Sequence, residues 1–360
     1  MVSSGDTTVV WNPQWRYSRT LVLNTSASGA NIAGNVLKFP VLVRLNAGTI
    51  DFSQAQTGGA DMRFTKSDNT FLPYEIERWD RALGMAEIWV KVDTVRGKNA
   101  TQSIIMYWGN PAVSDSSNST AVFDTSAGYQ GVWHLGDGAN DPAGDATVNG
   151  YHGISPDTAR PRVAVGAIGR CRQFDGVSDY IAMPYTANGK VNFPENGNYT
   201  VSAWVTIDAF DGASYVIAAK GYDQYFMRLT YFPSNTPLWE FAELSSADTW
   251  LACTTAATSR QWILVTGVRQ GSKQFLYCNG IPVDSTPNIY PTNNFSRNTS
   301  SDLSIGKFLT PVDVPNFNDS YCFFKGSIDE VRIMSAARNA DWVRLCYMNQ
   351  RADDRLVVFK

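Results

Sequence analysis

Paired carboxylates are the first residues in this sequence that could carry out chemistry. A retaining glycoside hydrolase needs two carboxylates about 5 Å apart, and alternate residues of one strand can supply them because every second side chain lies on the same face. Glu75 and Glu77 in "YEIER" have this spacing. Asp329 and Glu330 in "SIDEVRI" are adjacent and should point to opposite faces of a strand. A solvated strand face explains Glu75 and Glu77 more simply than catalysis does, so we assign no catalytic residue.

Histidines could act as catalytic bases, but the sequence has only His134 and His152. His134 follows Trp133 on an expected strand, where a core or rim histidine is the simpler interpretation. Neither the zinc motif H-E-x-x-H nor the phosphate-binding loop G-x-x-x-x-G-K-S/T is present. The sequence therefore supports neither transition-metal nor nucleotide chemistry.

The segment "LGDGANDPAGDATVNGYHG" carries Asp and Asn between glycines. Oxygen ligands on flexible backbone are what calcium prefers, although this spacing does not match an EF-hand. Turn formation explains Asp137, Asn140, Asp141 and Asp145 about as well, because Asp and Asn side chains hydrogen-bond to the backbone in turns. Both interpretations stay open.

The elements that position these residues are expected to be β-strands. Of the 360 residues, 44% are hydrophobic and 18% charged, and Gly, Asn, Ser, Thr and aromatic residues are abundant, as in strands joined by turns. The net charge of −3 and the lack of a Lys or Arg block argue against a nucleic-acid partner. No apolar run is long enough for a membrane span, and the N-terminus lacks a secretory-signal pattern.

Alternating patterns predict strands in two regions, separated by the small, polar, aperiodic residues 109–124. "KFPVLVRLN" and "AEIWVKV" belong to the first region, and "YTVSAWVTI" to the second. In the second, "RQWILVTGVRQGSKQFLYCNGIPV" reads as a three-stranded meander, and Asn279-Gly280 is a strong hairpin signal. We predict an all-β fold of two β-sandwich domains, residues 1–118 and 119–360.

The end of the chain combines a strand with a helix. Strict alternation in "SIDEVRI" places Ile328, Glu330 and Arg332 on one face, and Asp329, Val331 and Ile333 on the other. Helical spacing follows, with Trp342, Leu345 and Cys346 on one side and Ser335 or Asn339 as a cap. One short C-terminal helix is therefore expected.

A family resemblance emerges from the order of several motifs. "GVWHLGDG", "RQFDGVSDYIAMP", "YTVSAWVTI" and "KGSIDEVRI" resemble the laminin G-like, concanavalin A-like jelly roll over roughly residues 127–350. "WRYSRTLVLNT", "GADMRFTKSDNTFLPYEIERWD" and "IIMYWGNP" resemble the bacterial domain of unknown function 2341, which typically precedes such jelly rolls in secreted proteins of fibre-degrading bacteria. The resemblance implies export, a place in a larger multidomain protein and a role near polysaccharide.

The resemblance also implies two structural features. Jelly-roll relatives often hold a calcium ion where the first and last strands of the domain meet, which suggests Asp329 with Asp175 or with a carbonyl near Gly136. If the same strands are neighbours, Cys171 and Cys346 could form a disulfide. Five cysteines without a C-x-x-C motif leave at least one thiol outside any intrachain bridge.

Aromatic residues beside turn signals are the candidates for binding sugars, since flat sugar faces stack on aromatic rings. They are Trp239, Trp250, Tyr222 and Tyr225, with Asp223 as a hydrogen-bonding partner. The leading hypothesis is noncatalytic binding of a polysaccharide or other glycan by a secreted or surface-attached pair of domains. A glycan-active enzyme with an atypical site and a protein-binding adhesion module are the alternatives.

Overall fold

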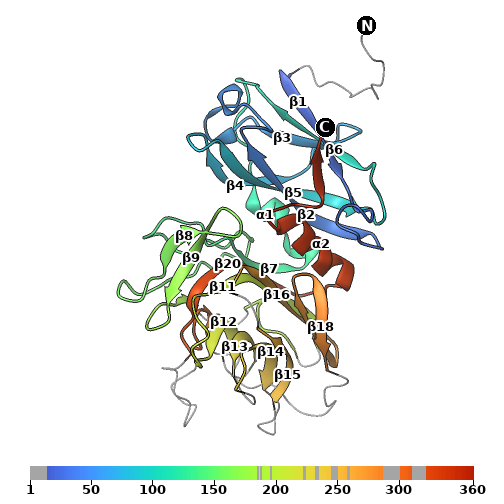
Figure 1. Cartoon of the computed structure of the whole chain (residues 1–360). Coiled ribbons are helices and arrows are strands. Elements are labelled where there is room, and N and C mark those ends of the chain that lie inside the picture. Colours follow the sequence, from blue (N-terminus) through green and yellow to red (C-terminus); the bar gives the residue numbers. More distant parts are fainter. Residues whose placement is uncertain are drawn as a thin grey trace. The chain divides into compact units, whose positions relative to one another are not determined.

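The computed structural model describes residues 14–360, except 185, 187–188, 195–196, 222–223, 232–234, 245–249, 258–259, 287–300 and 310–321. The predicted all-β fold is confirmed, with α1 (Ser119–Val122) and α2 (Ala340–Gln350) as the α-helices of the described residues (Figure 1). The chain forms two compact units. One contains the residues up to Phe123 together with Met348–Lys360, and the other contains Asp124–Tyr347.

Two antiparallel sheets build the first unit. The four-stranded sheet has the order β21 (Val357–Phe359), β1 (Tyr17–Leu23), β6 (Ser103–Trp108) and β3 (Arg63–Lys66). The three-stranded sheet has the order β2 (Val36–Asn46), β5 (Met85–Val95) and β4 (Tyr74–Asp80). The predicted strands "KFPVLVRLN" and "AEIWVKV" are β2 and β5, which pair along most of their length.

The C-terminal segment belongs to this first unit. Strand β21 pairs with β1, with Phe359 opposite Leu21. The Asn349 amide group donates to the Leu42 carbonyl at 2.9 Å and accepts from the Leu42 amide at 2.7 Å, so it covers the edge of β2 in the way a further strand would. The sequence division at 118/119 does not include this return, because a pairing between the two ends of a chain leaves no local signal.

Two larger sheets build the second unit. The six-stranded sheet has the order β10 (Ile181–Met183), β19 (Leu303–Ile305), β12 (Tyr215–Lys220), β13 (Tyr225–Thr230), β14 (Leu238–Leu244) and β15 (Trp250–Ala256). The eight-stranded sheet has the order β18 (Ile281–Ser285), β17 (Lys273–Cys278), β16 (Ile263–Gln270), β11 (Tyr199–Ile207), β20 (Lys325–Met334), β9 (Arg170–Asp175) and β8 (Arg162–Val165), and β7 (Tyr129–Trp133) also pairs with β20.

Local predictions in this unit are confirmed. Strands β16, β17 and β18 form the meander, and Asn279 and Gly280 have φ of 50° and 75°, as a type I′ turn requires. The helix α2 begins after Asn339, whose side chain accepts from the Trp342 amide at 2.9 Å. The predicted C-terminal helix and its cap are therefore both present.

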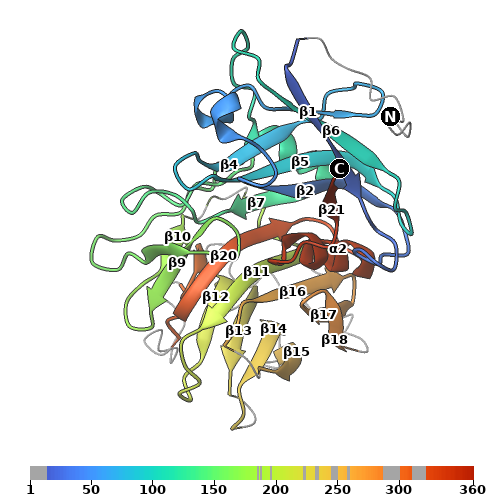
Figure 2. The ribbon, with the colours of Figure 1, turned by 45° about the horizontal axis from the view of Figure 1, so that its top comes forward.

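A β-bulge changes the predicted faces of β20. Strands β11 and β20 lie side by side (Figure 2). Ser202 of β11 lies opposite Arg332, but Trp204 lies opposite Asp329, so β20 contains one extra residue. Glu330 is in the left-handed region with φ of 52°, as at an irregular position in a ladder. The prediction that Ile328 faces away from Val331 and Ile333 is wrong, because the bulge brings all three into the core between the sheets.

Candidate functional site

Two of the predicted sugar-binding aromatics are core residues. Trp239 and Tyr225 are each 1% exposed and lie in the main hydrophobic cluster between the two sheets. The Tyr225 hydroxyl donates to the Val191 carbonyl at 3.1 Å, so its polar end is also used inside the unit. Neither ring offers a face for stacking on a ligand, so the prediction that Trp239 and Tyr225 bind sugar is wrong.

The other three residues predicted to bind sugar are Tyr222, Asp223 and Trp250, and the structure does not test this role. Tyr222 and Asp223 lie outside the described residues. Trp250 is the first residue of β15, opposite Leu244. A ligand contact at these three positions stays a prediction.

The predicted disulfide is not formed. Cys171 and Cys346 are both free thiols. The Cys171 sulfur lies 3.3 Å from the Val165 carbonyl of the neighbouring strand β8, whereas Cys346 lies on α2 within electrostatic reach of Arg332 and Arg338. Burial raises the pKa of each thiol to about 12. The prediction is wrong because the two side chains pack against different partners.

The strand register separates the two predicted calcium carboxylates. Asp175 pairs with Lys325, and Arg172 pairs with Ile328, so Asp329 lies four ladder positions from Asp175. At about 3.3 Å per residue, their backbones are roughly 13 Å apart, whereas calcium ligands lie at about 2.4 Å from the ion. Asp175 and Asp329 cannot share one ion in this register.

Each of these carboxylates already has a structural role. Asp175 accepts from the amides of Val177, Ser178 and Asp179 in the turn after β9. Asp329 accepts from the Ile168 amide at 2.9 Å. A calcium site that uses Asp329 and a carbonyl near Gly136 stays a prediction, which melting in excess chelator would test.

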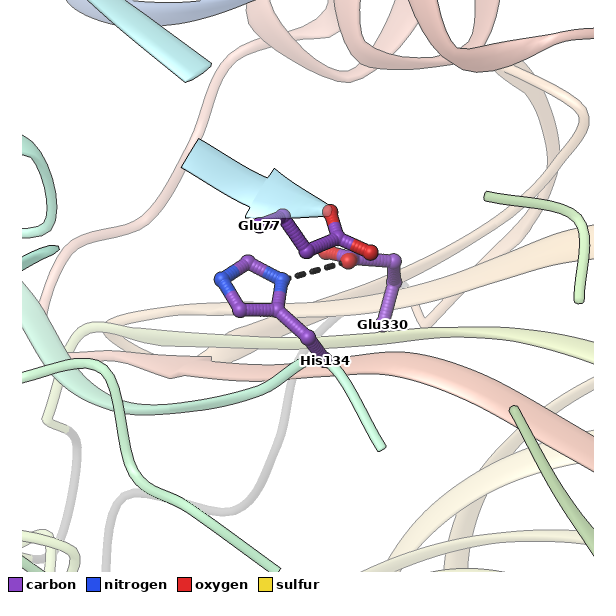
Figure 3. A group of neighbouring side chains, drawn as sticks. All are labelled: Glu77, His134 and Glu330. Atoms are coloured by element: carbon purple, nitrogen blue, oxygen red, sulfur yellow. Dashed lines mark hydrogen bonds and ion pairs between the residues drawn. The ribbon is translucent and has the colours of Figure 1, made fainter. Parts of the chain in front are cut away.

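Glu330 is part of a buried ion network rather than an acid–base pair with Asp329. Its carboxylate lies 2.5 Å from Nδ1 of His134 (Figure 3). It also lies 2.6 Å from Nη2 of Arg332. Burial alone would raise the pKa of Glu330, but His134 and Arg332 outweigh it and lower that pKa to about 2. The interpretation of His134 as a structural histidine agrees with this geometry, because its ring is held by the carboxylate.

The two glutamates of β14, Glu240 and Glu243, are also paired. Glu240 forms an ion pair with Arg228 directly opposite it on β13, whereas Glu243 bonds to Arg269 and to the Tyr199 hydroxyl. Burial raises the pKa of Glu243 to about 7, against the opposing effect of Arg269. These partners place Glu240 and Glu243 in different surroundings, so they do not form a hydrolase pair.

The alternation that would pair Glu75 with Glu77 is interrupted. The register of β4 against β5 shifts between Ile76 and Arg78, which makes Glu77 the additional residue. Glu77 accepts from the indole nitrogen of Trp89 at 2.7 Å. This bond gives Glu77 a structural role within the first unit.

A surface pocket in the second unit is built in part by the Asp- and Asn-rich segment, residues 135–153. The segment is fixed by Asp145, which accepts from the amides of Val132, Thr147 and Tyr151 at 2.9–3.0 Å. Asp145 is 7% exposed, so its carboxylate holds the loop through buried hydrogen bonds. Turn formation is thus the role of Asp145.

Backbone pairing connects the loop to the six-stranded sheet. Ala143 and Gly153 exchange two hydrogen bonds of 2.8 Å, and Ile154 and Ala182 of β10 do the same. A side chain at Gly153 would collide with Ile181, since its Cβ would lie 2.3 Å from that residue. The loop is therefore held as an extension of the sheet, with a close approach that requires glycine.

The pocket has a volume of about 90 Å³ and lies between this loop and the strand β9. Its lining residues include Asn140, Asp141, Ile154, Ser155, Arg160 and Arg172. Nη2 of Arg172 donates to the Gly138 carbonyl at 2.9 Å, and Arg172 is only 2% exposed. Burial lowers the pKa of Arg172, with Asp137 acting in the opposite direction. The pocket thus has a buried guanidinium at its base.

The rim of the pocket combines polar groups with the exposed apolar side chains of Ile154 and Pro142. Arg160 donates to the Asn140 amide oxygen at 3.2 Å and to the Asp157 carboxylate at 2.8 Å. Asn140 and Asp141 are exposed, and Ile154 is 52% exposed. Planar amide, carboxylate and guanidinium groups around an apolar surface can hydrogen-bond to the hydroxyls of a ligand and contact its C–H groups.

The sequence signal for this pocket was partial. Asn140 and Asp141 stand in the segment that was singled out for its oxygen ligands. Arg160 and Arg172 have no comparable signal, because isolated arginines in "TARPRVAVGAIGRCR" are typical of solvated charges. Only the pairing of β9 with β8 and of Ile154 with Ala182 brings them to one place.

Two unlike β-sandwich units define a tandem of β domains, the second of them a jelly roll with a loop pocket. Residues 58–134 match the domain of unknown function (DUF2341), and residues 175–344 match the Concanavalin A-like lectin/glucanases superfamily. The chain therefore carries the two domains that the sequence predicts, in the predicted order. No curated protein matches the chain.

Solved structures show distant similarity. The binding domain of Paraclostridial Mosquitocidal Protein 1 is 14% identical with a TM-score of 0.47, and the alignment covers 61% of this chain and 52% of that chain. Domain 4 of AbnA, a GH43 extracellular arabinanase from Geobacillus stearothermophilus, was solved in complex with arabinotriose. It is 18% identical with a TM-score of 0.42, and the alignment covers 60% of this chain and 97% of that chain. A structure of botulinum neurotoxin type C, whose cell entry depends on interaction with two ganglioside molecules, is 13% identical with a TM-score of 0.44. That alignment covers 62% of this chain and 52% of that chain. The chain thus spans about half the length of the two toxin chains.

The described residues contain no helix long and apolar enough to cross a membrane.

Proposed function

We propose that this protein binds carbohydrate without catalysing a reaction, and that the pocket formed by Asn140, Asp141, Ser155, Arg160 and Arg172 is its binding site. The superfamily of the second domain comprises lectins and glucanases, which makes carbohydrate the ligand class to consider first, although a fold alone does not fix function. The observation that carries the proposal is the pocket itself, with a buried guanidinium at its base and planar polar groups at its rim. The proposal includes action outside the cell, as the sequence resemblance implies.

The charges around the pocket favour an uncharged sugar. Arg160 is paired with Asp157, and the positive charge of Arg172 faces Asp137 and Asp141. The site therefore offers hydrogen-bonding directions with little net charge, and a neutral sugar hydroxyl can both donate to a carboxylate and accept from a guanidinium. Exposed Ile154 gives the C–H face of the ring an apolar surface.

Affinity gel electrophoresis over cellulose derivatives, xylan, arabinan, mannan, pectin and mucin glycans tests the proposal. Asp141→Ala and Arg160→Ala should each weaken retention about tenfold to thirtyfold, because a hydrogen bond to a charged group contributes about 1.5–2 kcal/mol. Both side chains lie at the surface, so the melting temperature should change little.

Lys325→Ala is the matched control, since Lys325 forms a partly exposed ion pair with Asp211 in the same unit and does not line the pocket. Its retention should equal that of the unchanged protein. If the Asp141 and Arg160 variants are retained as strongly as the unchanged protein, the binding site lies elsewhere. If no polysaccharide retains the unchanged protein, carbohydrate binding is refuted. Release of reducing ends from a retained polysaccharide would contradict the noncatalytic part of the proposal.

A further inference from the structure

A second cavity lies within the first unit, for which the domain description gives no function. It has a volume of about 510 Å³, within the roughly 300–1,000 Å³ of typical ligand clefts. Its walls are the end of β3 with the following turn, the last part of β5, and the start of β6 with the residues before it. We call this cavity the first-unit groove.

The groove exists because β4 pairs with only part of β5 and, among the described residues, leaves the last residues of β5 without a partner strand on that side. The pairing of the two strands ends at Tyr74 opposite Val90, and the Lys91 amide makes one more bond, to the Pro73 carbonyl. The residues of β5 beyond this point, Val92–Thr94, line the groove. The two sheets of the sandwich are thus open to solvent here.

Gln102 lines the groove and bonds to backbone groups at the end of β5. Its side-chain nitrogen donates to the Thr94 carbonyl at 2.6 Å, and its side-chain oxygen accepts from the Arg96 amide at 2.8 Å. Its own amide donates to the Asn99 side chain at 2.6 Å. These bonds use the backbone groups with which an added peptide strand would have to pair, so strand addition at this position is disfavoured.

The charges of the groove cancel. Lys66 on β3 forms an ion pair with Asp93 on β5, which joins the two walls, and Asp68 and Arg96 add one charge of each sign. The other polar lining residues offer hydroxyls and an amide: Ser67, Thr94, Thr101, Gln102 and Ser103. The two apolar lining residues, Val92 and Ile104, are 3% and 1% exposed, so the accessible lining consists of polar groups together with the carbon atoms of the polar residues that carry them.

We infer that the first-unit groove is a second ligand site, and that it takes a segment of a neutral, hydroxyl-rich polysaccharide. An anionic or cationic ligand would meet equal numbers of repelling and attracting charges, and an apolar peptide side chain would displace water from the polar lining groups without replacing its hydrogen bonds. A chain of hydroxyls can donate to Asp68 and Asp93 and accept from Lys66 and Arg96. The site is independent of the pocket in the second unit.

A charge-neutral double variant of the whole chain tests the inference. Lys66→Ser with Asp93→Ser removes one charge of each sign, so its mobility without polysaccharide should be unchanged. In an Asp141→Ala background, which weakens the pocket of the second unit, this variant should reduce the remaining retention by xylan or mannan about tenfold, because several hydrogen bonds are lost together. Arg351→Ser with Asp353→Ser is the control, since it removes another exposed ion pair of the first unit.

Hydrogen exchange with the same polysaccharides provides a second measurement. Binding in the groove should slow amide exchange in residues 92–96 and 101–104, which line it or flank its lining. Unchanged retention of the Lys66/Asp93 variant with no protection of these segments would overturn the inference while leaving the pocket proposal intact. Protection by pectin alone would also overturn it, because that result requires a charged ligand.

Discussion

Replacement of Trp239 by Ala separates a core residue from a binding residue most clearly. Trp239 is 1% exposed on β14, opposite Leu229 on β13 and Thr255 on β15. An aromatic side chain of this kind buries about 150–250 Å², and at about 25 cal/mol per Å² this burial contributes roughly 4–6 kcal/mol. Measured substitutions of buried aromatics by Ala give about 3–5 kcal/mol. We therefore expect a loss of about 4 kcal/mol in the free energy of unfolding of the second unit.

Thermal melting paired with affinity electrophoresis measures this effect. For a unit of this size, about 2–4 °C per kcal/mol predicts a melting temperature lower by roughly 12 °C. Retention measured well below that temperature should be unchanged, because Trp239 does not line the pocket. Trp239→Phe is the control, since it keeps most of the buried area and should shift melting by less. A Trp239→Ala protein that melts normally but loses retention would refute the burial argument and restore the stacking role.

Two further predictions follow from buried titratable groups. Burial raises the pKa of Glu243 to about 7, so the folded state binds this proton more tightly than the unfolded chain does. Its contribution is therefore fully present below the ordinary carboxyl pKa and is lost as the pH rises through about 7, by at most about 1.4 kcal/mol per pH unit. Urea unfolding of the protein and of Glu243→Gln between about pH 5 and pH 8 should show a stability difference that changes with pH in this direction, and a constant difference would contradict it. The second prediction concerns four thiols whose pKa burial raises to about 12: Cys171, Cys253, Cys278 and Cys346. They should resist alkylation in the folded protein at neutral pH, and reductant should leave the melting temperature unchanged. A melting temperature lowered by reductant would show that a disulfide exists.

The strands were predictable because alternation is a local signal that core packing reinforces. Trp239 shows how this signal could have been used further. In "LWEFAEL", Trp239 lies two residues before Phe241 and therefore on the same face of the strand. Both residues belong to the same core cluster. A face shared with a buried Phe indicates core, whereas closeness to a turn only indicates the end of a strand. The alternation of β14 therefore predicts the burial of Trp239 better than its distance from a turn does.

The pocket in the second unit could be predicted only in part. The Asp- and Asn-rich loop was visible from composition, because turn-forming and oxygen-bearing residues are concentrated there. Arg160 and Arg172 reach that loop through pairings between strands that a local pattern does not encode. The return of Asn349 to Leu42 is unpredictable for the same reason, since the contact joins residues from the two ends of the chain.

The adjacent acids in β20 show how one irregular residue determines the role of its neighbours. A non-glycine residue with positive φ is strained by about 1–3 kcal/mol and persists only where its surroundings hold it. Glu330 is held by His134 and Arg332, so the ion network and the bulge support each other. The bulge in turn allows Ile328 and Val331 to face the core together. The carboxylates of this strand are therefore explained by the requirements of the fold, and the search for ligand chemistry moves to the loop pocket and the first-unit groove.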